Sequence, residues 1–144
     1  MKAIRLLVIL TLAGLPRSEL QVVTASGTHR FKVWIAADSE SRARGLMDVR
    51  KLAHDEGMLF LFERSHYTTF WMKDTYLSLD LIFIRADGVV VNVAENTRPL
   101  TIDLIPSAAP VKAVLELLVL INRLFLNIEP EPERTHIPDK LAPV

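Results

Sequence analysis

The densest hydrophobic pattern of the chain runs from Gly57 to Gly88. This stretch holds four of the six phenylalanines and both tyrosines, with only short polar interruptions. Apolar runs of this length predict neighbouring strands of one sheet that meet in the core. The run 58–62 is apolar on both faces, which is typical of a central strand. Further strands are predicted over 68–72, 77–85 and 89–93, and Asp87-Gly88 is a strong signal for a hairpin turn between the last two.

The segment before this stretch predicts a hairpin and a short helix. Residues 20–25 and 28–36 flank Ser26-Gly27, a dipeptide that suits a tight turn. Between 30 and 36, Phe31, Val33 and Ile35 alternate with Arg30, Lys32 and Trp34, which is the period of a strand with one buried face. A helix is then expected over 39–44, started by Asp38 and stopped by Gly45.

The segment after it is less regular. Residues 95–110 contain three prolines and no periodicity, and are expected to form a long surface loop. A strand is predicted over 111–117, a buried helix over 118–126 and a part-ordered, proline-rich tail over 129–144. Together the pattern predicts one α+β domain, mainly β, in which a twisted and largely antiparallel sheet forms a small barrel or sandwich covered by one or two short helices.

The amino terminus has the layout of an export signal. A short basic region, 1–5, precedes the apolar run Leu6 to Leu15. This run has about half of the roughly 20 residues that a membrane-spanning helix needs, so no stable span is expected after processing. We expect residues 1–19 to be an export segment, 20–128 the domain, and the location to be periplasmic or secreted. The alternative is a buried terminal strand or helix of a cytoplasmic protein.

Composition removes several classes of function. The 17 basic and 17 acidic residues balance, which argues against nucleic acid as a partner. The absence of cysteine excludes disulfides, thiolate metal sites and a cysteine nucleophile. The nucleotide-binding, zinc-protease and hydrolase motifs are also absent, so no cofactor is predicted.

Six residues form the candidate site, because each sets a polar group among apolar neighbours: Arg44, Trp71, Lys73, Asp74, Asp80 and Glu116. One interpretation is structural, with Asp80 or Glu116 paired to Arg44 or Lys73, since an unpaired buried charge is costly. The functional interpretation is a shallow cleft in which Trp71 offers a flat face. On a strand, Trp71 and Lys73 share one face and Phe70, Met72 and Asp74 share the other.

Several strings of the chain together resemble one family. They are Arg44-Gly45-Leu46-Met47, Gly57-Met58-Leu59-Phe60, Phe70-Trp71-Met72-Lys73, Leu79-Asp80, Asp87-Gly88 and Val114-Leu115-Glu116. Their order resembles domain-of-unknown-function family 192 (DUF192) over about 20–128. The resemblance implies a compact, mainly β domain that is often exported and has no established activity. Asp74 departs from the asparagine usual in the family, and 118–120 and 129–131 depart from its small residues and glycines.

The function expected from the sequence is that of a non-enzymatic binding or accessory module for a small polar ligand, such as a carbohydrate. One alternative is a small hydrolase that divides acid and base roles among Asp74, Asp80 and Glu116. A second is a periplasmic Cu(I) protein, since thioether and imidazole groups suit Cu(I). Its candidate ligands are Met47, Met58, Met72, His29, His54 and His66.

Overall fold

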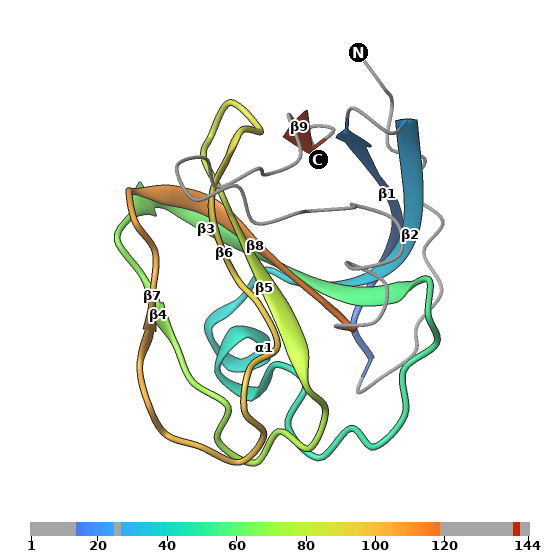
Figure 1. Cartoon of the computed structure of the whole chain (residues 1–144), viewed down its shortest axis with the longest axis vertical. Helices are drawn as coiled ribbons and strands as arrows, with labels where there is room; N and C mark the ends of the chain where they lie inside the picture. Colours follow the sequence, from blue (N-terminus) through green and yellow to red (C-terminus); the bar gives the residue numbers. More distant parts are fainter. Residues whose placement is uncertain (1–13, 25–26, 119–139, 142–144) are drawn as a thin grey trace.

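The computed structural model describes residues 14–24, 27–118 and 140–141, and this part of the chain is mainly β with one short helix (Figure 1). Its elements in chain order are β1 (Arg17–Thr24), β2 (Gly27–Ala36), α1 (Ser39–Arg44), β3 (Glu56–His66), β4 (Thr69–Phe70), β5 (Leu79–Ile84), β6 (Val90–Ala94), β7 (Ile105–Pro106), β8 (Val111–Leu118) and β9 (Lys140–Leu141). No described helix is long and apolar enough to cross a membrane.

Seven strands form one mixed sheet in the order β6-β5-β8-β3-β2-β1-β9. The pair β2 and β3 is parallel, and the other pairs are antiparallel. A parallel pair needs a long connection, and here α1 lies within it. β4 and β7 form a separate antiparallel ribbon. The expected largely antiparallel sheet is therefore present, with one parallel step next to its centre.

The sheet is buried on both faces. One face carries what we call the concave cluster, which joins Leu20 and Val22 of β1 to Val90 of β6. β1 and β6 lie near opposite ends of the strand order, yet both contribute to this cluster, and the sheet is strongly coiled (Figure 1). The other face carries the helix-side cluster, to which Phe60, Met72 and residues after α1 contribute. The described part of the chain shows no closed barrel.

The local predictions with the clearest signals are confirmed. β1 and β2 form the expected hairpin, with Thr24 opposite Gly27. α1 spans 39–44 with Asp38 as its N-cap, and the Asp38 side chain accepts a hydrogen bond from the Ser41 N–H at 2.8 Å. β3 is central, and β5 and β6 pair as the hairpin that Asp87-Gly88 predicted.

Other predictions need correction. The strands between Gly57 and Gly88 are not neighbours, because β8 lies between β3 and β5 and β4 belongs to the ribbon. The strand expected over 68–72 is limited to β4, and the loop 95–110 contains β7. Trp34 is buried on the helix-side face, so the end of β2 is covered on both faces. The helix expected over 118–126 lies outside the described residues, except that Leu118 ends β8, and most of the tail also lies outside them.

Candidate functional site

α1 forms one wall of the candidate site. The basic residues Arg42 and Arg44 lie in its last turn, where they complement the negative end of the helix. Arg42 ties the helix to β3, because its Nη1 donates to the backbone oxygen of Leu61 at 2.9 Å. The helix stops at Gly45, whose φ of 51° favours glycine and whose missing Cβ would stand 3.1 Å from Cζ of Phe60. The chain thus turns closely over an aromatic ring.

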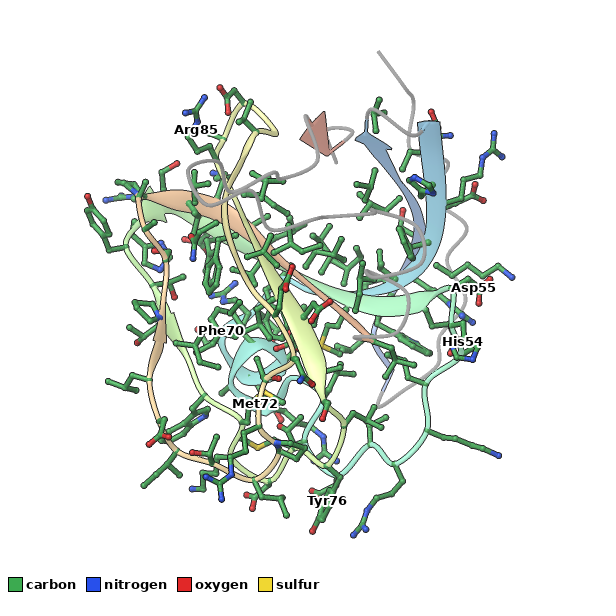
Figure 2. The ribbon with its side chains drawn as sticks, viewed as in Figure 1. His54, Asp55, Phe70, Met72, Tyr76 and Arg85 are labelled. Carbon is green, nitrogen blue, oxygen red and sulfur yellow. The ribbon has the colours of Figure 1, made fainter. Side chains whose placement is uncertain are left out.

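The ribbon of β4 and β7 forms the opposite wall. Thr69 pairs with Pro106 and Phe70 with Ile105. The Met72 N–H continues the ribbon by donating to the Thr101 oxygen at 3.0 Å. Figure 2 shows Phe70 and Met72 directed toward α1 and the interior, whereas Tyr76 lies at the outer end. The inner side of the ribbon is therefore apolar and faces the helix.

Glu116 of β8 lies at the base between these walls. Its register partners are Met58 of β3 and Leu81 of β5, so its side chain enters the helix-side face of the sheet. The residue is only 4 % exposed, and burial raises the pKa of its carboxyl group to about 8. Its Oε2 has no hydrogen-bond partner among the described residues. Glu116 is consequently a mostly neutral acid at pH 7 with unused hydrogen-bonding capacity.

A pocket of about 300 Å³ is enclosed by these elements, and we call it the Glu116 pocket. It is lined by Arg42, Ala43, Arg44, Gly45, Leu46, Met47, Phe60, Phe62, Thr68, Thr69, Phe70, Trp71, Thr75 and Glu116. The rings of Phe60 and Phe70 meet edge to face, with centroids 4.9 Å apart. The pocket combines aromatic walls, one buried acid and two guanidinium groups from α1.

Three of the six predicted site residues converge on this pocket, namely Arg44, Trp71 and Glu116. Lys73 lies just outside it, with its Nζ 5.3 Å from the centroid of the Trp71 ring. Both residues are exposed, and Trp71 is 45 % exposed, while Met72 between them is buried. The structure therefore places Trp71 and Lys73 together on the surface, as the alternation in the sequence suggested, although β4 has already ended at Phe70.

The remaining two lie elsewhere. Asp74 is exposed in a turn with a φ of 51° and does not line the pocket. Asp80 is opposite Leu117 in the register, which puts it on the concave face, and its Oδ1 accepts a hydrogen bond from the Asn96 N–H at 2.7 Å. Within the described part, the ion pairs do not include one that joins Asp80 or Glu116 to Arg44 or Lys73, which are the partners expected from the sequence.

Sequence reasoning missed several pocket residues. Arg42 was not a candidate, although it shares the last turn of α1 with Arg44. Phe60 and Phe70 carried no polar group and so resembled ordinary core residues, and Thr68 and Thr69 were assigned only to a strand. The signal that could have found them is their position in or next to the family-like strings that begin at Arg44, Gly57 and Phe70.

The candidate Cu(I) ligands lie in different settings. Met58 and Met72 are fully buried in the helix-side cluster, as expected of core residues. His54 lies at an edge of the molecule away from Met72 (Figure 2). Over 14–24, 27–118 and 140–141, no three histidine, aspartate or glutamate side chains gather as a metal site would require.

The fold and the pocket define a class: a small, mainly β domain with a buried glutamate under an aromatic pocket. The chain belongs to the DUF192 family, described as "Uncharacterized ACR", and the match covers residues 21–119. No curated protein shows significant similarity to it.

Two crystal structures are similar to this chain over nearly its whole length. One, named as a "putative transcription regulator" from Sinorhizobium meliloti 1021, is 35% identical with a TM-score of 0.81, and the match covers 92% of this chain and 97% of that one. The other, a protein of unknown function from Novosphingobium aromaticivorans, is 33% identical with a TM-score of 0.83, covering 98% and 93% respectively.

Proposed function

We propose that this protein is a non-enzymatic binding module that holds a small polar ligand in the Glu116 pocket. The observation that carries the proposal is the unpartnered Oε2 of a glutamate that is only 4 % exposed and lines the pocket. Leaving a buried polar group without a partner costs about 1–3 kcal/mol. A ligand that donates a hydrogen bond to this oxygen would remove the cost, and the pocket of about 300 Å³ has room for a small molecule.

The exposed rim supports the same proposal. Trp71 offers a large ring at the mouth of the pocket, and the Lys73 ammonium lies over that ring. An aromatic surface beside a charged hydrogen-bond donor suits the apolar and polar sides of a small polar molecule, carbohydrates included. Trp71 would contact a bound ligand from outside while Glu116 contacts it from below.

Two other functions have less support. Paired-carboxylate hydrolysis needs two acids in one cleft, yet Glu116 lines the pocket without Asp74 and Asp80, and Asp80 lies on the other face of the sheet. The name of the Sinorhizobium protein suggests regulation of transcription. The described residues contain one helix, the six-residue α1, which gives this role little support. The balanced charge of the whole chain also offers no broad attraction to nucleic acid.

We also propose that the protein is exported and that its sheet closes into a small barrel or sandwich. The strong coiling of the sheet supports the second point. For the first, β1 begins at Arg17, directly after the apolar run that ends at Leu15, and the Pro16 oxygen accepts a hydrogen bond from the Ile35 N–H at 2.8 Å. Cleavage before Leu15 would leave β1 whole, and mass spectrometry of the secreted protein would locate the cut.

The binding proposal is tested by thermal-shift measurements with a panel of monosaccharides, amino acids, small amines and small carboxylates. A true ligand at 100 times its dissociation constant should stabilise the protein by about 2.7 kcal/mol. The shift should disappear in Glu116→Leu and weaken in Trp71→Ala. It should survive in Tyr67→Ala, a matched control because Tyr67 is also an exposed aromatic residue and does not line the pocket.

Either of two results would overturn the proposal. The first is a panel in which no compound stabilises the wild-type protein. The second is a ligand whose shift is the same in wild type, Glu116→Leu and Trp71→Ala, because such a ligand must bind elsewhere.

A further inference from the structure

We propose that the ligand of the Glu116 pocket is a small zwitterion whose ammonium group sits between Glu116 and the aromatic walls and whose carboxylate group meets Arg44. Free amino acids are the chemical class. This inference rests on the binding function proposed above and names its ligand. The two ends of the pocket differ in charge and in hydrogen-bonding capacity.

The inner end suits an ammonium group better than a sugar. Glu116 is the acid among the residues that line the pocket, and the rings of Phe60 and Phe70, which meet edge to face, share that lining away from the exposed Trp71. Aromatic faces attract cations, and a carboxylate completes such a cage. A sugar brings several hydroxyl groups, each of which needs a partner when buried. Apart from Glu116 and the two arginines, the lining offers only three threonine hydroxyls, and that of Thr75 already donates to the Lys73 oxygen at 3.0 Å.

The outer end suits an anionic group. Arg42 is engaged by the backbone, since its Nη1 contacts the oxygens of Ala37 and Leu61, and its guanidinium lies 5.6 Å from the centre of the Phe62 ring. Arg44 is exposed at the pocket, and its side chain forms no hydrogen bond or ion pair within the described residues. The planar guanidinium group of Arg44 can therefore bind a carboxylate with two parallel hydrogen bonds.

Binding of an ammonium group should release a proton. The charged or titratable side chains that line the pocket are Glu116 of β8 and Arg42 and Arg44 of α1. In the empty pocket burial raises the pKa of Glu116 to about 8, so at pH 7 its carboxyl group is mostly protonated. The ligand's ammonium favours the carboxylate, and the displaced proton leaves for solvent. The affinity should therefore rise about tenfold per pH unit toward pH 8 and level off above it.

The test is isothermal titration of the full chain with alanine, 4-aminobutyrate, butylamine, butyrate and glucose at pH 7. One of the two zwitterions should bind at least tenfold more tightly than butylamine, butyrate and glucose. Titration in phosphate and in Tris, whose ionisation enthalpies differ, should show about one proton released per ligand bound. Glucose or butyrate as the tightest probe would overturn the ligand class and leave the binding function standing. If none of these probes binds but another compound of the thermal-shift panel does, the ligand class fails and the binding function stands; if that whole panel also fails, both proposals fail.

Variants separate the two ends of the ligand. Glu116→Gln should abolish the proton release and weaken the zwitterion at least tenfold. Arg44→Gln should leave the proton release intact and bring the affinities of 4-aminobutyrate and butylamine close together. Arg64→Gln is the matched control, because Arg64 is an exposed arginine of β3 that does not line the pocket. An unchanged ratio of the two affinities in Arg44→Gln would contradict the role of Arg44.

Discussion

A Cβ atom placed on Gly57 would stand 2.4 Å from the backbone oxygen of Glu116. Gly57 is buried in β3 and lies opposite Leu117 in the register with β8, so the two central strands approach each other at a place where only glycine fits. The same approach fixes the backbone that carries the Glu116 side chain. The packing of the sheet and the geometry of the pocket thus depend on one missing methyl group.

Gly57→Ala should destabilise the protein by about 1–3 kcal/mol, because the new methyl group must push β8 away from β3. Leu117 cannot relieve the strain by moving alone, since the closest atom belongs to the backbone of Glu116. Urea unfolding measures the change, and ligand binding should weaken in parallel as β8 shifts. A variant as stable as the wild type would show that the strands separate freely here.

The stability of the protein should depend on pH through Glu116. The folded protein holds the Glu116 proton up to a pKa of about 8, whereas the unfolded chain releases it near the ordinary value of 4.5. Between these values the unfolded state binds fewer protons, so stability falls as pH rises, by at most about 1.4 kcal/mol per pH unit. The wild type should therefore lose stability relative to Glu116→Gln from pH 5 to pH 8. Parallel denaturation curves across that range would contradict the burial of an unpaired acid.

Glu116→Leu should be more stable than the wild type and unable to bind ligand. Leucine has a similar size, and it removes a buried oxygen whose missing partner costs about 1–3 kcal/mol. Thermal unfolding at pH 7 measures the gain, and titration with the wild-type ligand measures the loss. A gain in stability at the expense of binding is the signature of a residue retained for function. A loss of stability in Glu116→Leu would instead assign Glu116 a structural role.

Thr97 is also a buried polar residue, but in contrast to Glu116 its role is structural. Its Oγ1 donates to the Leu79 oxygen at 2.8 Å and accepts from the Leu79 N–H at 3.1 Å, in a buried setting. Thr97→Val keeps the shape and removes the acceptor of the buried Leu79 N–H, while the Leu79 oxygen keeps the hydrogen bond from the Thr97 backbone N–H at 3.0 Å. The unpartnered N–H should cost about 1–3 kcal/mol. Thr101→Val is the control, because the Thr101 hydroxyl group accepts an exposed hydrogen bond from the Asp103 N–H, and valine keeps the backbone oxygen that binds the Met72 N–H. Equal stability losses in the two variants would count against the bridge.

Elements defined by their own residues were predictable from the sequence. Asp38 and Gly45 mark the two ends of α1, and they could be recognised because capping is a local interaction. Asp87-Gly88 identified the hairpin of β5 and β6 for the same reason. Glu116 could be singled out because an acid in an apolar strand is conspicuous. Trp71 and Lys73 could be paired because they are two residues apart.

Contacts between distant segments were not predictable. Nothing in the residues of β3 and β5 indicates that β8 separates them, since pairing of long-range strands depends on the whole chain. Asp80 and Glu116 resemble each other in sequence, each among leucines, yet the register places them on opposite faces. The pairing of Phe70 with Ile105 likewise joins segments far apart in the sequence, and the ribbon that contains this pair makes Phe70 a wall of the pocket.

The position of β8 has a consequence for how the chain is made. β8 lies between β3 and β5, although it follows both in the sequence, and it contributes to both core clusters. Until residue 118 has been synthesised, β3 and β5 have no strand to join them, and contacts of such long sequence separation form late. In a chain exported as we propose, this order of events keeps the domain unfolded during synthesis, which is the state in which a polypeptide threads through a narrow translocation channel.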